Sequence, residues 1–141
     1  MKLLFNTLLL LLIMPTFAYA NEGSCQVDLD KLIWAEAEYA ISGDTIIVQN
    51  QRVRLIGIQA PQIERKEKFQ TPGEPLAKEA QLFLNKLLAN NNLKIGIEYD
   101  STRIDNRNRQ LVHLFLEDGS NVQQKLLESG YVISQTSYDN T

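Results

Sequence analysis

The sequence has very little cysteine or histidine, with one residue of each among 141. A single cysteine excludes a disulfide framework within the chain, so Cys25 is either a free thiol near the N-terminus or the partner of a cysteine in another molecule. One cysteine and one histidine also exclude a zinc finger or another soft-metal site, which leaves only metals with oxygen ligands.

Positive charge is not in excess either. The chain has 14 Lys and Arg against 17 Asp and Glu, a formal net charge of −3 and a pI of about 5.2. These values argue against an extended polybasic surface, so any binding of nucleic acid must depend on a local cluster of positive side chains. Apolar residues, in contrast, make up 44% of the chain, which excludes a disordered tail and suits one small domain.

Residues 1–20 have the pattern of a secretory signal peptide. A basic start at Lys2 precedes an apolar run that ends at Pro15, and the small residues Ala18 and Ala20 stand at −3 and −1 of a cleavage point. The run is too short to span a bilayer comfortably, and a buried N-terminal helix is the alternative interpretation. We therefore expect an exported protein, periplasmic or secreted, whose mature chain of 121 residues (141 − 20) keeps no stable membrane anchor.

The remaining chain predicts a polar lead over residues 21–36 and one domain over 37–141. Hydrophobic patterns predict two helices, at 76–88 and 122–129, and strands at 32–41, 45–48, 53–58, 93–99, 111–116 and, as a short last strand, 131–133. Polar loops are expected at 62–74 and 100–108. Five main strands with a helix between the third and the fourth are the layout of an OB-fold, a small β-barrel.

Several motifs of this sequence resemble the thermonuclease (staphylococcal nuclease) family. Residues 42–45 (SGDT) and 54–62 (RLIGIQAPQ) are similar to the family's Asp-Gly-Asp-Thr turn and to its Arg-Leu-x-x-Ile-Asp-x-Pro-Glu strand end. Further matches are Glu79-Ala80, Asp105-x-x-x-Arg109 and the helix end from Leu126 to Gly130, so that the resemblance covers residues 37–130. It implies an OB-type barrel that hydrolyses DNA and RNA phosphodiesters with calcium.

The resemblance assigns roles to four positions. Arg54 and Arg109 take the places of two phosphate-binding arginines, a role that suits the planar, two-pronged guanidinium group. Asp44 takes the place of a calcium-binding carboxylate. Ala60 takes the position whose backbone carbonyl binds calcium, which does not depend on the side chain.

Two positions depart from the family pattern. Gln59 stands where the second calcium carboxylate is expected, and because an amide oxygen carries no negative charge, we expect calcium binding to be weak or absent. Gln62 stands where a glutamate activates the attacking water, and an amide cannot take a proton from water near neutral pH. Loss of a general base costs about 10²–10⁴ in rate. Glu64, two residues further on, is the candidate substitute for the missing carboxylate.

Other residues are candidates for contact with the substrate. Arg107 lies in the polar segment before Arg109, and Tyr138 falls near the family's nucleotide-stacking tyrosines. A charged run in the 62–74 loop is either a solvated surface or a contact to a nucleic-acid backbone through Arg65, Lys66 and Lys68.

Each of these residues also has an ordinary structural interpretation. Arg54 can be a solvated or salt-bridged barrel residue, Arg109 a surface arginine and Asp44 a turn residue. Their joint spacing favours the phosphate-binding interpretation. His113 lies within an apolar strand and is interpreted as a packed barrel residue.

The resemblance also implies a further C-terminal helix, which this chain lacks, so the sequence is either truncated or encodes a domain of lower stability.

We expect a monomer, and three functions stay open. The first is an enzyme with weakened or lost activity on single-stranded or unwound DNA or RNA. The second is a non-catalytic module that binds nucleic acid or phosphate, and the third is a degenerate domain with a structural or interaction role. Gln59 and Gln62 favour the last two, and the arginine pair favours the first two.

Overall fold

The structure, a computed structural model, describes residues 27–66 and 72–136. Its elements in chain order are η1 (Leu29–Lys31), β1 (Ile33–Glu36), β2 (Tyr39–Ser42), β3 (Thr45–Val48), β4 (Gln51–Leu55), β5 (Ile58–Gln59), α1 (Ala77–Asn90), β6 (Lys94–Ile104), β7 (Gln110–Phe115), α2 (Val122–Ser129) and β8 (Ile133–Ser134). The predicted signal peptide lies outside the described residues, as do Cys25, Lys68 and Tyr138. In the described part of the chain, no helix has the length and apolar character needed to cross a membrane.

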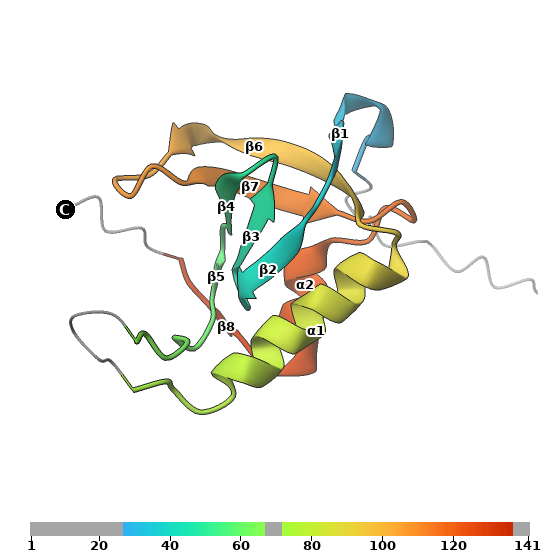
Figure 1. Ribbon diagram of the computed structural model, residues 1–141. Coiled ribbons are helices and arrows are strands. Elements are labelled where there is room, and N and C mark those ends of the chain that lie inside the picture. The colour runs from blue at the N-terminus through green and yellow to red at the C-terminus, as the bar shows by residue number, and fades with distance from the viewer. Residues whose placement is uncertain (1–26, 67–71, 137–141) are drawn as a thin grey trace, which may run out of the picture.

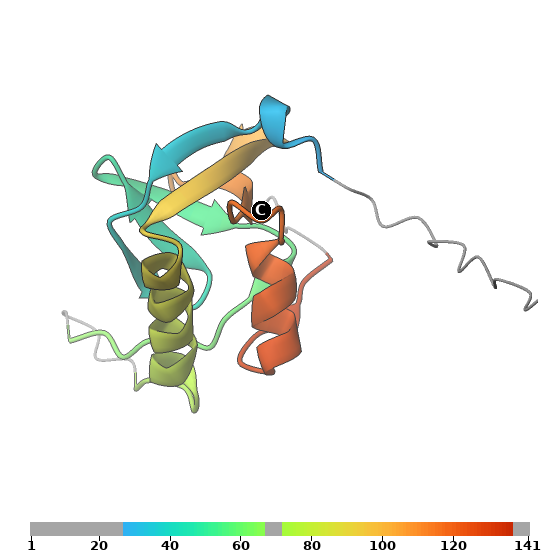
Figure 2. The same ribbon diagram turned by 90° about the vertical axis from the view of Figure 1, so that its right-hand side faces the viewer.

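Six strands form one curled sheet in the order β1-β6-β7-β4-β3-β2, and β5 pairs with β8 in a small second sheet (Figure 1). Neighbouring strands of the curled sheet are antiparallel except β4 and β7, which run parallel. Helices α1 and α2 lie side by side against one side of this sheet (Figure 2). The apolar core fills the space between the sheet and the helices, with Leu84 and Leu88 of α1 and Leu126 of α2 fully buried. The fold is therefore the mainly β, OB-type architecture that the sequence predicts.

The single strand predicted over residues 32–41 is wrong in detail, because the structure divides it into β1 and β2. The division falls at Ala37 and Glu38, whose backbone N–H groups donate to different strands: Ala37 to the carbonyl of Leu93 just before β6 (2.7 Å), and Glu38 to that of Ile47 in β3 (2.8 Å). The two halves thus lie at the two ends of the strand order. The expected five strands become six, and the folded domain includes β1, which lies within the predicted polar lead.

Two other predicted boundaries also move. The strand expected over 53–58 begins earlier, at Gln51, because Gln49 and Asn50 adopt positive φ angles (50° and 60°) and form the tight turn. It also ends earlier, at a turn where Gly57 has φ of 78°, so β5 is a separate strand. Strand β6 continues to Ile104, through part of the polar segment that was expected to be a loop.

The helices are closest to prediction. Helix α2 has the predicted bounds because both of its ends have local signals: the Asn121 side chain accepts a hydrogen bond from the Gln124 N–H, and Gly130 ends the helix with φ of 76°. Helix α1 packs against β2, where the side chains of Gln81 and Asn85 bind the backbone of Ala40. These contacts cover the outer edge of β2, which would otherwise be open to pairing with another chain.

Close packing of α1 also holds the turn after β2 in place. A Cβ atom added at Gly43 would lie 2.6 Å from Cβ of Ala80 in α1 and 2.9 Å from Cβ of Ala60. Only glycine fits between the helix and the segment after β5. The residue that follows, Asp44, is thereby held at the centre of the candidate site.

Candidate functional site

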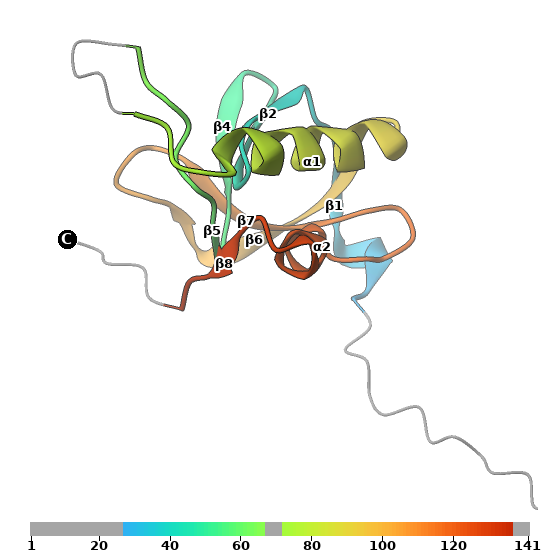
Figure 3. The ribbon, with the colours of Figure 1, turned by 90° about the horizontal axis from the view of Figure 1, so that it is seen from below.

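A cavity of about 740 Å³ lies beside β2, β3 and β4, between the segment that follows β5 and the turn between β6 and β7. Figure 3 shows this segment and this turn on the same side of the molecule. The cavity brings together almost all of the site residues that the sequence predicts: Asp44, Arg54, Gln59, Ala60, Gln62, Glu64, Arg107 and Arg109. Arg65 and Lys66 line it as well. Tyr138 is the one predicted site residue that lies outside the described part of the chain.

The cavity concentrates the arginines of the chain. Five of the six arginines in the sequence line it, namely Arg52, Arg54, Arg65, Arg107 and Arg109. With Lys66 there are six positive side chains against two carboxylates, Asp44 and Glu64, although the whole chain has a net charge of −3. We call this cavity the arginine cleft, and it is the local cluster of positive charge that the composition left open.

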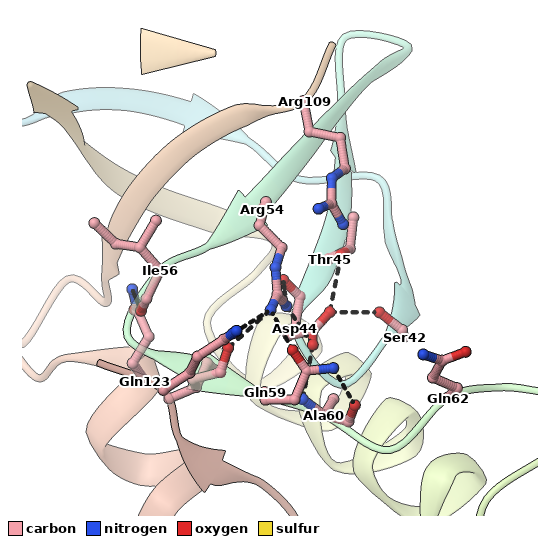
Figure 4. A network of polar contacts seen from close by, with 12 residues as sticks. Ser42, Asp44, Thr45, Arg54, Ile56, Gln59, Ala60, Gln62, Arg109 and Gln123 are labelled. Atoms are coloured by element: carbon pink, nitrogen blue, oxygen red, sulfur yellow. Dashed lines mark hydrogen bonds and ion pairs between the residues drawn. The ribbon is translucent and has the colours of Figure 1, made fainter. Parts of the chain in front are cut away.

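A buried ion pair between Arg54 and Asp44 forms the floor of the arginine cleft (Figure 4). These residues are only 5% and 6% exposed. Oδ1 of Asp44 accepts hydrogen bonds from the hydroxyl groups of Ser42 (3.0 Å) and Thr45 (2.9 Å), and Oδ2 accepts one from the backbone N–H of Ala60 (2.7 Å). Both carboxylate oxygens are therefore fully engaged within the protein.

The other side of the Arg54 guanidinium is also bound by the protein. Its Nη2 donates to the Ile58 carbonyl (2.9 Å), to Oε1 of Gln59 (3.1 Å) and to Oε1 of Gln135 (3.4 Å). Gln135 follows β8, whose pairing with β5 brings the end of the described chain to the site. Arg54 therefore ties together β4, β5 and the segment after β8.

Arg109 is held differently, by a carboxylate four residues earlier. Its Nε and Nη2 both lie 2.7 Å from Oδ2 of Asp105, and Oδ1 of Asp105 accepts the backbone N–H groups of Arg107 (2.9 Å) and Arg109 (2.8 Å). Burial by itself would raise the pKa of Asp105. The hydrogen bonds and the positive charge of Arg109, with the N–H of Arg107, outweigh burial and lower this pKa below its ordinary value. Asp105 thus orients Arg109 at the edge of the cleft.

The family model for staphylococcal nuclease homologues matches residues 52–141, a range that includes all five arginines of the cleft. The chain belongs to the staphylococcal nuclease homologue family. This result confirms the family resemblance and agrees with the observed OB-type fold. No curated protein matches the sequence significantly.

The two glutamines that depart from the nuclease pattern lie in different surroundings. The Gln59 side chain is half-buried and donates from Nε2 to the Ala60 carbonyl (3.3 Å). Gln62 is exposed on the far side of the cleft, and Figure 4 shows its side chain without a contact to the other residues drawn. Its backbone N–H donates to Oε2 of Glu74 (2.6 Å), while its carbonyl accepts from the Glu74 N–H (2.9 Å). The backbone of Gln62 therefore pairs with Glu74. Its side chain makes no hydrogen bond to the residues drawn and lines the cleft.

The sequence did not predict two residues of this candidate site, Arg52 and Gln135. Arg52 lies two positions before Arg54 in β4, and residues two apart in a strand point to the same face, so the alternation was a usable signal. Gln135 had no such signal, because only the β5–β8 pairing brings it to Arg54. His113 is half-buried in β7 with Nδ1 3.2 Å from Nε2 of Gln123, away from the residues that line the cleft. It is a packed sheet residue, as predicted.

Proposed function

We propose that this domain binds the sugar-phosphate backbone of single-stranded DNA or RNA in the arginine cleft and hydrolyses it slowly or not at all. The observation that carries the proposal is the gathering of five of the six arginines around one cavity of about 740 Å³. Guanidinium groups match phosphate oxygens in shape and charge. An acidic protein that places its arginines together is suited to hold an anion there rather than over its whole surface.

The arginines of the cleft have two different roles in this proposal: some hold the protein together and others contact phosphate. Arg54 is committed to Asp44 and to the backbone, so it shapes the floor of the cleft. Arg52 and Arg107 are exposed and, among the described residues, form no ion pair within 4.0 Å. Their side chains are available to phosphate, and Arg109 joins them from its fixed position on Asp105.

The site is poorly equipped to catalyse hydrolysis. The position of the expected general base holds Gln62, and an amide cannot accept a proton from water near neutral pH. Loss of such a base costs about 10²–10⁴ in rate. Glu64 is a carboxylate on the same cavity, and it favours the second candidate function, a slow nuclease that uses Glu64 in place of the missing glutamate.

Binding is tested by fluorescence anisotropy with a fluorescein-labelled single-stranded oligonucleotide at several salt concentrations. We expect Arg52→Ala and Arg107→Ala each to weaken binding several-fold and to reduce the salt slope by about one. Arg103→Ala is the matched control, because Arg103 is the one arginine outside the cleft and covers the ring of Tyr99 at 5.0 Å. Binding that is insensitive to salt, or equal losses in all three variants, would contradict the proposal.

Hydrolysis is tested with denatured DNA in calcium and in chelator. We expect no cutting, or cutting at least a hundredfold slower than by an enzyme with an intact general base. If slow cutting occurs and Glu64→Gln abolishes it without weakening binding, the second candidate function is supported. Cutting that survives in Glu64→Gln would exclude it.

A further inference from the structure

At the floor of the arginine cleft, the Gln59 side chain contacts both the guanidinium of Arg54 and the backbone carbonyl of Ala60. We infer that this bridge closes the position where the family resemblance implies calcium, and that Gln59 is the residue that makes the cleft independent of calcium. The claim that nucleic acid is held without calcium rests on the proposed function. The claim that calcium does not bind depends only on the contacts described next.

The carboxylate at this position has no vacant acceptor for a cation. An ionised carboxylate offers about four lone-pair positions, and Asp44 makes four contacts. Ser42 and Thr45 bind Oδ1 through their hydroxyl groups, while the Ala60 N–H and the Arg54 guanidinium bind Oδ2. A calcium ion could reach Asp44 only by displacing one of these donors. Displacing Arg54 would leave a buried positive charge beside a divalent cation.

The carbonyl ligand is covered as well. Nε2 of Gln59 donates to the Ala60 carbonyl at 3.3 Å, while Oε1 of Gln59 accepts from Nη2 of Arg54 at 3.1 Å. The reversed amide would place its NH₂ group against the guanidinium and its oxygen against the carbonyl, and both contacts would be repulsive. The amide therefore has one favourable orientation, and in it a hydrogen-bond donor occupies the face of the carbonyl that a metal would use.

The surrounding donors do not compensate. Calcium takes six to eight oxygen ligands and gains affinity from the charge of its carboxylates. Within the described residues, no group of three or more His, Cys, Asp or Glu side chains is placed to hold a metal ion. The donor set at Asp44, Gln59 and Ala60 does not fit calcium, and the same three residues instead keep Arg54 fixed beneath the anion-binding cleft.

The test is a titration of the full chain with calcium chloride alone, by isothermal titration calorimetry and by the shift of the thermal unfolding midpoint. Two isosteric variants are compared. Gln59→Glu places a carboxylate against both Arg54 and the Ala60 carbonyl, whereas Gln135→Glu places the same charge against Arg54 alone. We expect no saturable binding by the natural chain up to about 5 mM calcium, a range that includes the 10⁻⁴–10⁻³ M affinities of weak calcium modules. We expect Gln59→Glu to gain saturable binding at about 1 mM or tighter, because its carboxylate competes with Asp44 for Arg54 and adds an anionic ligand beside the Ala60 carbonyl. Gln135→Glu adds charge near Arg54 but leaves the Ala60 carbonyl covered by Gln59, so we expect it to gain none.

Each other outcome counts against the inference. Saturable binding by the natural chain would show that calcium reaches the site despite Gln59. A folded Gln59→Glu variant that stays insensitive to calcium, or an equal gain in Gln135→Glu, would show that Gln59 is not the deciding residue.

Binding of the labelled oligonucleotide is then measured in calcium and in chelator at equal ionic strength. Equal dissociation constants within about twofold are expected, and a tenfold gain in calcium would overturn the inference. Absence of oligonucleotide binding in both buffers would refute the proposed function alone, because the calcium titration does not depend on it.

Discussion

Replacement of Arg54 by methionine is the most direct test of the ion pair at the floor of the cleft. Methionine keeps most of the apolar stem and removes the guanidinium, which leaves the Asp44 carboxylate buried without its charged partner. Loss of one partner of a buried pair costs about 3–5 kcal/mol. Three donors to Asp44 remain, the hydroxyls of Ser42 and Thr45 and the N–H of Ala60, which moderates the loss. The guanidinium also serves backbone and amide acceptors that would become unpaired, which adds about 1 kcal/mol.

We therefore expect Arg54→Met to lower the free energy of unfolding by about 4 kcal/mol. Small domains have about 5–15 kcal/mol in total, so this is a large share. Urea denaturation followed by the fluorescence of Trp34, the single tryptophan, measures the change. With a slope of about 1–3 kcal/mol per molar urea, the midpoint falls by roughly 1.3–4 M.

Arg103→Met is the control, since Arg103 is exposed and surface substitutions stay within about 0.5 kcal/mol. Combining Arg54→Met with Asp44→Asn, which removes the orphaned charge, is expected to cost less than the two single changes added together, by about 0.5–3 kcal/mol. A loss below about 1 kcal/mol for Arg54→Met, or strict additivity with Asp44→Asn, would refute the view that the pair holds the floor together.

Three further predictions concern residues around the site. Gly43→Ala is expected to destabilise the domain by about 1–3 kcal/mol in urea, because its Cβ would lie 2.6 Å from Cβ of Ala80; an unchanged midpoint would contradict it. The lowered pKa of Asp105 predicts a stabilising contribution that is complete above its ordinary value of 3.8 and is lost as the pH falls through the lowered pKa; Asp105→Asn should then match the natural chain in acid but not at pH 7. Gln123→Leu is expected to cost about 1–3 kcal/mol, because the buried amide binds backbone groups of β7, and its loss should exceed that of an exposed glutamine of α2.

The accuracy of the sequence-based prediction follows how local the deciding contacts are. Helix α2 has the predicted bounds because Asn121 and Gly130 act on the residues next to them. The strands on either side of the β3–β4 turn were also predicted, at 45–48 and 53–58, because short apolar runs are a local signal; the structure joins them through Gln49 and Asn50, whose φ angles are positive. The break of the first strand at Ala37 was missed, since it depends on hydrogen bonds to Leu93 and Ile47, which are distant in sequence or on another strand.

The same distinction applies to the candidate site. Motif spacing identified Arg54, Arg109 and Asp44, and the structure places all three at one cavity. Spacing could not show that Arg54 and Asp44 bind each other, nor that Gln135 completes the shell of the guanidinium. Phosphate binding by Arg54 stays a prediction, because the contacts of its guanidinium to Asp44, Ile58, Gln59 and Gln135 also fit a structural role.

The sequence by itself determined the family, the OB-type succession of strands and helices and the residue types at the cleft, because these depend on local patterns and on chemistry carried by single side chains. It also determined that two expected carboxylates are amides, since Gln59 and Gln62 are read directly. Only the tertiary structure decided where charge gathers: five arginines from three separate segments meet at one cavity in a chain of net negative charge. The physical reason is that electrostatic fields and hydrogen-bond networks depend on distances between segments, which only folding sets.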